Sequence, residues 1–293
     1  MRKQLVKTVA GVLKSDPRTA VLLGDIGVFG FRDCFKDFPD RVYNIGILEQ
    51  ATIGMAAGLA ISGMIPIVHT IAPFLVERAY EQLKLDFGYQ KMGGNFVSVG
   101  ASYDYAALGS THHCPADVGV LSQIPEMEIV LPGTAQEFDC LFREAYADGN
   151  PTYFRLSEQS NATSHAVHFG KAEVVQTGAA ATVVAVGTML DAVKEAAAGH
   201  DVTVLYYTTL APFDAETLRA NCLSAKVLLC EPYYYGALTT AVTEALAPRP
   251  VRIVHVGVPH AFIAHYGKKA EHDADFGLTA AGVRRKLEEL LNE

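Results

Sequence analysis

The sequence predicts an α/β protein with two doubly wound domains, each built on a parallel sheet. Strand and helix patterns alternate along almost the whole chain, and the expected strands are continuous apolar runs. Such runs are typical of parallel strands that helices cover on both faces. The chain has 293 residues and 50% of them are hydrophobic, which is enough for two cores.

The first domain is expected at residues 1–160. Apolar runs predict its strands at residues 20–24, 42–45, 65–69, 95–100, 128–131 and 152–156. Its helices are expected at residues 2–13, from 49 onward, 74–89 and 135–147. The helix from residue 49 consists mainly of Ala, Gly and Met, and small residues let another helix approach closely. It fits a core helix and a subunit interface equally well.

The second domain is smaller and is expected at residues 173–293. A polar stretch rich in Ser, Asn and His precedes it, and we place the linker at residues 161–172. Strands are predicted at residues 182–186, 202–206, 226–230 and 252–256. Helices are predicted at residues 190–198, 214–222, 238–246 and from 278 onward.

Composition argues against several classes of protein. A net charge of -8 and the lack of a basic run argue against a nucleic-acid surface. The most apolar stretch, residues 53–68, is too short for a membrane span and is interrupted by Ser62, Gly63 and Pro66. The five cysteines are scattered without CxxC spacing, and no signal-peptide pattern is visible. We therefore expect a cytoplasmic protein that binds neither membranes nor nucleic acids.

One carboxylate stands at the start of the apolar helix. Glu49 lies in the segment NIGILEQ, at residues 44–50. A carboxylate in this position is strongly desolvated, and buried carboxylates are costly unless they meet a partner. Acidic residues are also ordinary in first helical turns. Position alone therefore leaves two roles open for Glu49, a helix-end charge or a group that handles a proton.

Four motifs, in this order, closely resemble the C-terminal half of transketolase, and most of all the separate subunit of two-chain transketolases. They are NIGILEQ at residues 44–50, FLVERAYEQ at 74–82, LGSTHH at 108–113, and IPEM followed by LPG at 124–133. The resemblance covers essentially the whole chain. It implies a pyrimidine-binding domain for thiamine diphosphate, followed by a transketolase C-terminal domain.

The resemblance implies a thiamine diphosphate site in which Glu49 is the catalytic acid. In this family the carboxyl group binds the pyrimidine ring and drives its amino group to the imino form, which deprotonates the thiazolium carbon. Phe74 would stack on the pyrimidine ring, and Ile47 and Arg78 would complete the cofactor contacts. His112 would donate a hydrogen bond to the substrate hydroxyl or to the developing alkoxide.

Simpler interpretations stay open for some of these residues. Arg78 and Glu81 also fit an ion pair on a helix surface. His113 stands where transketolases often carry glutamine, so we expect it to support His112. A metal site on these two histidines lacks a carboxylate at suitable spacing, and Cys114 fits a loop thiol better than a nucleophile. We therefore expect no metal ligand in this chain.

The resemblance also implies a partner subunit. In this family a Gly-Asp-Gly segment and a later Asn hold the diphosphate through Mg²⁺ or Ca²⁺, and both belong to the N-terminal half. Residues 24–27 (GDIG) are not that motif. We therefore expect a separate N-terminal transketolase subunit that supplies the metal and diphosphate ligands. The enzyme would be an α2β2 heterotetramer with active sites between chains.

The expected substrate site departs from that of ordinary transketolases. Arg2 matches a family arginine that binds the sugar phosphate, but Glu158 stands where a second arginine is usual. An acid facing a phosphate is repulsive by about 1 kcal/mol or more even in a solvated site. Unless Arg155 replaces that arginine, the site suits a modified or unphosphorylated sugar. Tyr103 replaces a family histidine before Asp104. The expected substrate-binding residues are Arg2, Tyr103, Asp104, His112, His113 and Arg155.

The expected activity is that of a transferase, moving a two-carbon ketol unit from a ketose donor to an aldehyde acceptor. Three alternatives stay open: a condensation like that of 1-deoxyxylulose-5-phosphate synthase, the β subunit of a 2-oxo acid dehydrogenase, and a non-catalytic subunit that stabilises its partner. In the second domain we expect the tyrosines at residues 233–235 and His260 and His265 to have no catalytic part.

Overall fold

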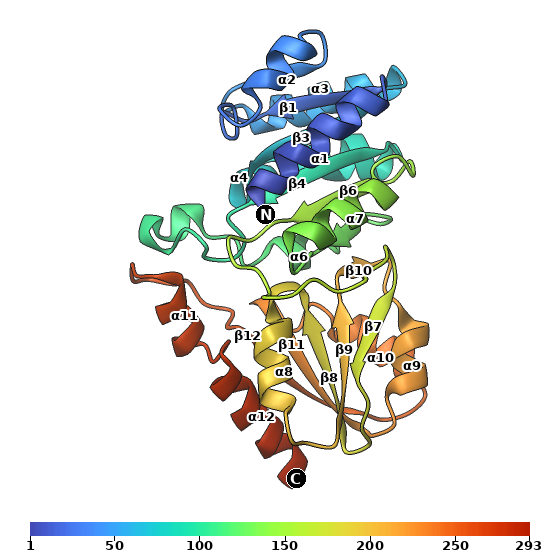
Figure 1. Cartoon of the computed structure of the whole chain (residues 1–293), viewed down its shortest axis with the longest axis vertical. Coiled ribbons are helices and arrows are strands. Elements are labelled where there is room, and N and C mark those ends of the chain that lie inside the picture. The colour runs from blue at the N-terminus through green and yellow to red at the C-terminus, as the bar shows by residue number, and fades with distance from the viewer.

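The computed structural model describes residues 1–293 and contains two α/β domains that lie one above the other along the long axis (Figure 1). The strands of the first domain are β1 (Thr19–Leu23), β2 (Val42–Asn44), β3 (Ile65–Ile71), β4 (Gly94–Val99), β5 (Glu128–Val130) and β6 (Pro151–Arg155). Its α-helices are α1 (Arg2–Ser15), α2 (Arg32–Asp37), α3 (Glu49–Ile61), α4 (Ala72–Val76), α5 (Tyr80–Gln82), α6 (Asp117–Leu121) and α7 (Ala135–Ala145). A π-helix, η1 (Leu83–Tyr89), and two 3₁₀ turns, η2 (Ala106–Leu108) and η3 (Ser110–His112), complete it.

The second domain continues the alternation after a stretch, residues 156–171, without helix or strand. Its strands are β7 (Ala172–Gln176), β8 (Ala181–Val186), β9 (Val202–Tyr207), β10 (Thr209–Ala211), β11 (Lys226–Tyr234) and β12 (Arg252–Val258). Its helices are η4 (Gly187–Met189), α8 (Leu190–Ala197), α9 (Ala215–Asn221), α10 (Thr239–Leu246), α11 (Lys269–Asp275) and α12 (Ala280–Asn292).

The two sheets confirm the predicted fold class. The first has the strand order β10-β5-β6-β4-β3-β1-β2 and the second β12-β11-β8-β9-β7. All neighbouring pairs are parallel except those of β10 with β5 and β7 with β9. These two antiparallel edge strands were not predicted. β10 is notable because it follows β9 of the second domain but pairs with the first sheet, so it joins the two domains.

The carboxyl ends of four neighbouring strands in the first sheet gather the expected site segments. β2, β1, β3 and β4 lie side by side in parallel. The loop after β2 leads to Glu49, α4 follows β3 and carries Phe74, and the loop after β4 carries His112. Ligands of open parallel sheets bind beyond the carboxyl ends of the strands. This edge is therefore the place to look for a site.

The prediction of one continuous helix at residues 74–89 is wrong. The structure divides this stretch into α4, a break at residues 77–79, α5 and the π-helix η1. Such π-helical segments are frequent at functional sites. The break also changes the expected ion pair, because Arg78 does not meet Glu81 but reaches across to Glu49 of α3.

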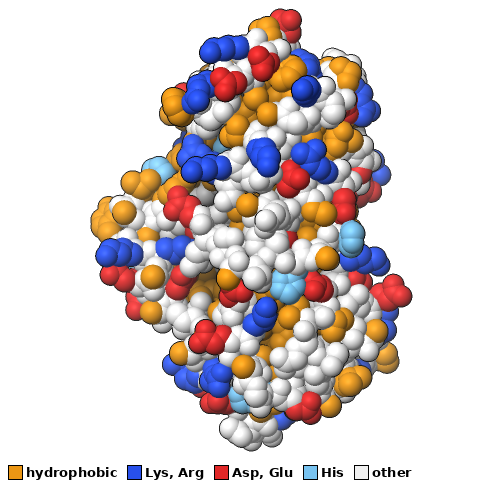
Figure 2. All heavy atoms as spheres, viewed as in Figure 1, with side chains coloured by type: hydrophobic (Ala, Val, Ile, Leu, Met, Phe, Trp, Pro, Cys, Tyr) orange, Lys and Arg blue, Asp and Glu red, His pale blue; other side chains and the backbone are white.

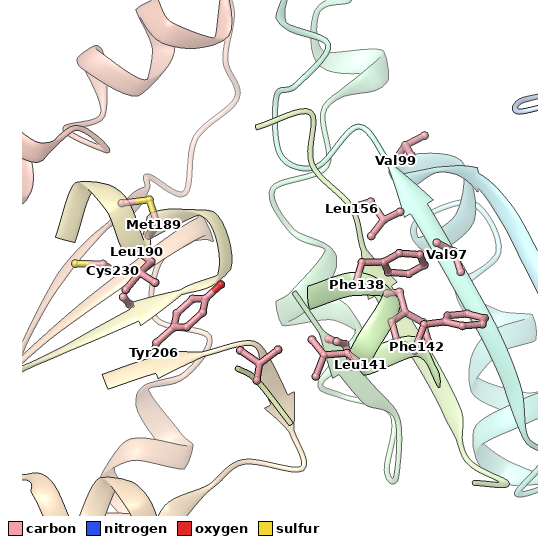
Figure 3. Close-up of a cluster of buried hydrophobic side chains, with 14 of the residues drawn as sticks. Val97, Val99, Phe138, Leu141, Phe142, Leu156, Met189, Leu190, Tyr206 and Cys230 are labelled. Carbon is pink, nitrogen blue, oxygen red and sulfur yellow. The ribbon is translucent and has the colours of Figure 1, made fainter. Parts of the chain in front are cut away.

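Large apolar side chains fill the space between the first sheet and α7, and one tyrosine links them to the second domain. Figure 3 shows Phe138 and Phe142 of α7 pointing toward Val97 of β4. Tyr206 of β9 approaches from the second domain, and its hydroxyl donates to Glu137 Oε2 of α7 at 2.8 Å. The two domains are thus held together by packing and by a buried hydrogen bond.

The surface mixes side chains of all kinds. On the face shown in Figure 2, Lys and Arg alternate with Asp, Glu and hydrophobic residues over both domains. None of the helices has the length and apolar character that crossing a membrane would need.

Candidate active site

Glu49 is a buried carboxylate with one satisfied and one unsatisfied oxygen. It opens α3 after a turn in which Gly46 has a φ of 87°, a left-handed conformation that favours glycine. The residue is 3% exposed. Its Oε2 accepts a hydrogen bond from Arg78 Nη1 at 2.8 Å, whereas Oε1 has no hydrogen-bond partner. Buried polar atoms are nearly always paired, so Oε1 indicates a site for a further donor.

The carboxylate of Glu49 is not used to cap its own helix. α3 has no side-chain cap, and no backbone N–H of its first turn donates to Glu49. In contrast, α7 begins with a capping box in which Glu137 accepts from the N–H of Thr134 at 3.1 Å. Of the two roles that position leaves open for Glu49, the geometry favours interaction with a group outside the helix.

Two side chains from α4 and the break after it cover this carboxylate. The guanidinium carbon of Arg78 lies 4.2 Å from the centre of the Phe74 ring. Arg78 therefore contacts Glu49 with its polar end and Phe74 with its planar face, an arrangement that suits a guanidinium. Ile47, two residues before Glu49 in the chain, is 65% exposed.

His112 joins the same group from the loop after β4. Its ring meets that of Phe74 edge to face, with centroids 5.3 Å apart. The hydroxyl of Thr111 lies 2.9 Å from His112 Nδ1, which leaves the other ring nitrogen free of protein partners. The structure thus brings together Glu49, Arg78, Phe74 and His112, four residues that the sequence singled out.

A second feature at this edge is a cavity of about 310 Å³ next to the start of α1. Arg2 and Glu158 both line it, with Tyr105 and Ser157. Glu158, which stands where related enzymes are expected to carry an arginine, therefore lies in the same cavity as Arg2. Tyr105 also contacts His112 edge to face, at a centroid distance of 6.5 Å, and connects the cavity to the first group.

Three of the expected substrate residues, Tyr103, Asp104 and Arg155, are buried, and two of them, Tyr103 and Arg155, contact the second domain. Tyr103 donates its hydroxyl to Asp273 Oδ1 at 2.8 Å. Asp104 accepts from the N–H of Glu158 at 2.9 Å, and burial raises the pKa of its carboxyl. Arg155 is 4% exposed. None of the three lines the cavity of Arg2.

Arg155 is committed to partners inside the protein. Its Nε donates to Asp117 Oδ2 at 2.7 Å, and Nη2 donates to Ser102 Oγ at 2.6 Å and to the carbonyl of Pro232 at 3.4 Å. Arg155 therefore connects the first domain to the second. It does not line the cavity of Arg2.

His113 and Cys114 follow His112 but point inward. His113 is buried, neither of its ring nitrogens has a hydrogen-bond partner, and desolvation lowers its pKa. Burial also raises the pKa of the Cys114 thiol well above its ordinary value, which makes the residue a poor nucleophile.

Sequence reasoning missed His69, the polar residue within the apolar run of β3. Nδ1 lies 2.8 Å from the carbonyl oxygen of Val97, and Nε2 has no partner. Burial lowers the pKa of His69 to about 4, so the ring is neutral at ordinary pH. It lies five residues before Phe74, at the end of the strand that leads to α4. A lone histidine inside a strand of Ile and Val was the available signal.

Comparison with known proteins identifies the two domains. Residues 1–163 match the transketolase pyrimidine binding domain, and residues 170–283 match the transketolase C-terminal domain. The chain is 40% identical over 288 residues to an uncharacterized 33.6 kDa protein in the fasciation locus of Rhodococcoides fascians, covering 97% of this chain and 92% of that one.

Two further relatives come from enzymes divided over separate chains. The chain is 30% identical over 281 residues to one of the subunits of the apulose-4-phosphate transketolase of Phocaeicola vulgatus, covering 92% of this chain and 87% of that one. It superimposes with a TM-score of 0.87 on a split-gene transketolase solved as an inactive beta4 tetramer, at 28% identity over 99% of this chain and 97% of that chain. These matches confirm the resemblance drawn from the motifs. The chain belongs to the transketolase family, as a C-terminal subunit that carries the pyrimidine-binding and C-terminal domains.

Proposed function

We propose that this chain and an N-terminal partner subunit together transfer a two-carbon ketol unit from a ketose to an aldehyde, using thiamine diphosphate. The observation that carries the proposal is Glu49 Oε1, a buried carboxylate oxygen with no partner. The other oxygen of the same carboxylate is held by Arg78, which in turn lies over the Phe74 ring. An enzyme of this family needs a dry carboxyl group that can share a proton with the cofactor, and this oxygen has that environment.

The residues present fit the pyrimidine ring of the cofactor. When bound, thiamine diphosphate supplies the nucleophilic carbanion that carries the two-carbon unit. Glu49 Oε1 would hold a proton against the ring nitrogen. Phe74 would offer a planar apolar face, and Ile47, which is exposed, would offer apolar contact from the loop before α3. Arg78 would keep Oε2 oriented through their hydrogen bond.

His112 would act on the substrate. The His112 ring packs edge to face with Phe74. Thr111 contacts Nδ1 of this ring, so Nε2 is available to donate. A donor placed where negative charge develops on a substrate oxygen lowers the barrier of the reaction. His113, buried behind it, would fix the backbone of this loop rather than contact substrate.

Several features support a partner subunit. The outer face of α3 and the loop before it expose large apolar residues, namely Ile47, Leu48, Met55 and Ile61. Exposed apolar surface of this kind marks interaction sites. The metal and diphosphate ligands of the family, for Mg²⁺ or Ca²⁺, would come from the partner in an α2β2 assembly. All five cysteines are free, which supports a reducing, cytoplasmic location.

Glu158, in the cavity of Arg2, supports a substrate whose end at that point carries no phosphate, because its carboxylate would repel one. With Arg155 committed to Asp117, Arg2 and Lys3 are the cationic side chains that line it, and Glu158 opposes them. We propose a modified or unphosphorylated sugar as donor or acceptor.

The test is ketol transfer by the reconstituted pair of subunits, with Glu49→Gln against Glu81→Gln as a matched control in the same region. Glu49→Gln should abolish transfer while leaving assembly intact, and Glu81→Gln should retain it. Activity that survives Glu49→Gln would refute the catalytic role and favour a stabilising subunit.

The same reconstituted enzyme separates the alternative activities. The chain is 32% identical to 1-deoxy-D-xylulose-5-phosphate synthase of Acidovorax sp., over 42% of that protein, so pyruvate is the rival donor. Release of carbon dioxide from pyruvate, without ketol transfer, would overturn the proposal. Faster turnover of xylulose 5-phosphate than of every unphosphorylated ketose would overturn the substrate part alone.

A further inference from the structure

The C-terminal domain carries a cluster of histidines next to the loop that holds His112. His265 lies in the segment of residues 259–268 between β12 and α11, and His272 and Asp275 lie on α11. Because positions 272 and 275 are three residues apart, their side chains leave the same face of the helix. The ring centroids of His265 and His272 are 4.7 Å apart, and His265 Nε2 is 3.5 Å from Asp275 Oδ2.

Two imidazoles and a carboxylate form a donor set that suits zinc and similar divalent ions. One ligand atom of each of the three residues lies within 4.8 Å of the other two. Bonds of about 2.0–2.1 Å in a tetrahedral site place ligand atoms about 3.3 Å apart, so the three must approach one another by up to about 1.5 Å. The side chains of His265 and Asp275 are each 58% exposed and can make this movement.

His272 gives a second, independent indication of a ligand. It is 0% exposed, and neither of its ring nitrogens has a hydrogen-bond partner. A buried imidazole without any partner is unusual, because buried polar groups are nearly always satisfied. Acidic residues 271, 273 and 275 lie close to it on α11, and Lys269, on the same helix, is already paired with Asp273 at 2.9 Å.

The histidine segment packs directly on the active-site loop. Ser110 Oγ donates to the carbonyl of Ile263 at 3.0 Å. The ring of Tyr266 lies so close to Gly109 that a β-carbon there would come within 2.8 Å of it. In Figure 1 the chain before α11 lies just below the loop that follows β4. Whatever fixes the segment therefore also fixes the loop that carries His112.

We propose that His265, His272 and Asp275 bind a divalent transition-metal ion of the zinc class. The ion clamps the segment of residues 259–268 onto α11 and so against the loop of His112. It is separate from the metal that the partner subunit would hold for the diphosphate. The expectation that this chain supplies no metal ligand rested on His112 and His113 alone, whose sequence neighbours include no carboxylate.

The first test is zinc binding by the full chain, stripped of metal, without a histidine tag, in competition with a chromophoric chelator. We expect one zinc ion per chain. His265→Ala and Asp275→Asn should each weaken binding by at least about tenfold. Both changes are at exposed side chains and leave the core intact. His168→Ala is the matched control, because His168 pairs with Glu144 at 3.0 Å on the surface without a second histidine.

No competition for zinc, or binding that His265→Ala and Asp275→Asn leave unchanged, would overturn the metal site. The second test is limited digestion with trypsin, which cleaves after Lys268 and Lys269, at the end of the segment. Zinc should slow this cleavage in the unmodified chain and in His168→Ala but not in His265→Ala. Zinc that binds without slowing cleavage would overturn the clamp. Neither readout depends on activity.

Discussion

Replacing Arg78 with methionine tests whether Glu49 depends on an ion pair within this chain. Arg78 Nη1 is 2.8 Å from Glu49 Oε2, and the side chains are 40% and 3% exposed, respectively. Removing one partner of a fully buried ion pair costs about 3–5 kcal/mol, because a buried charge is left uncompensated. Water reaches Arg78, so we expect a smaller loss of stability, about 1–2 kcal/mol.

Thermal unfolding of the isolated chain measures this loss. Each kcal/mol should lower Tm by about 2–4 °C for a protein of this size class. In a cycle with Glu49→Gln, the double variant should be more stable than the sum of the two single changes predicts, by at least about 1 kcal/mol, because the stranded charge is gone.

A control cycle uses Lys286→Met and Glu289→Gln, an exposed pair 2.7 Å apart on α12. Its coupling should not exceed about 0.5 kcal/mol. Additive effects of Glu49→Gln and Arg78→Met would refute the claim that the ion pair compensates the buried carboxylate.

Three further outcomes are expected. The pKa of His69 is lowered from 6.5 to about 4 by burial, so stability should be present above pH 6.5 and be lost as the pH falls toward 4. Between these pH values the unfolded chain binds a proton at His69 that the folded chain does not, which lowers the free energy of unfolding by up to about 3 kcal/mol. His69→Gln should flatten this part of a plot of unfolding free energy against pH. Glu158→Arg should lower the KM of the reconstituted enzyme for xylulose 5-phosphate by about tenfold or more, because repulsion becomes attraction, whereas Glu126→Arg, far from the cavity, should not. Tyr103→Phe should lower the free energy of unfolding by about 1–2 kcal/mol, since Asp273 loses a buried hydrogen bond, and an unchanged KM for sugar would show that Tyr103 only braces the domains.

The alternation of the main strands and helices and the grouping of Glu49, Phe74 and His112 were predictable from sequence, whereas β7, β10, α2, α6 and α11 were not. Each of these residues belongs to a short motif that follows a strand, and parallel topology brings strand ends to one edge of the sheet. The grouping itself came from the resemblance to transketolase, and the parallel topology explains why the structure has it. The resemblance also placed Arg2 and Glu158 in one substrate region, and the structure has both in one cavity.

Contacts between distant segments were not predictable. Tyr103 and Asp273 are 170 positions apart, and Arg155 meets Asp117 across two elements. The motif at residues 74–82 gave the correct residues, but its helical spacing suggested a pair of Arg78 with Glu81. The structure breaks the helix instead, and Arg78 meets the buried carboxylate of Glu49 rather than the exposed Glu81. β10 has three residues, too few to give a periodic signal.

Two features that the chain leaves unsatisfied lie next to each other at the start of α3. Glu49 Oε1 lacks a donor, and Ile47 and Leu48, directly before it, are 65% and 58% exposed. An unpaired buried oxygen and exposed apolar side chains both cost free energy. A hydrogen-bond donor to Glu49 would remove the first cost, and a protein surface packed on Ile47 and Leu48 would remove the second. Both would act at the first turn of α3. Ligands that stabilise the same local conformation assist one another, and by linkage the effect is reciprocal. In the function we propose, the position of Glu49 would therefore couple cofactor binding to subunit assembly energetically, and a measurement of either affinity with and without the other ligand would test this.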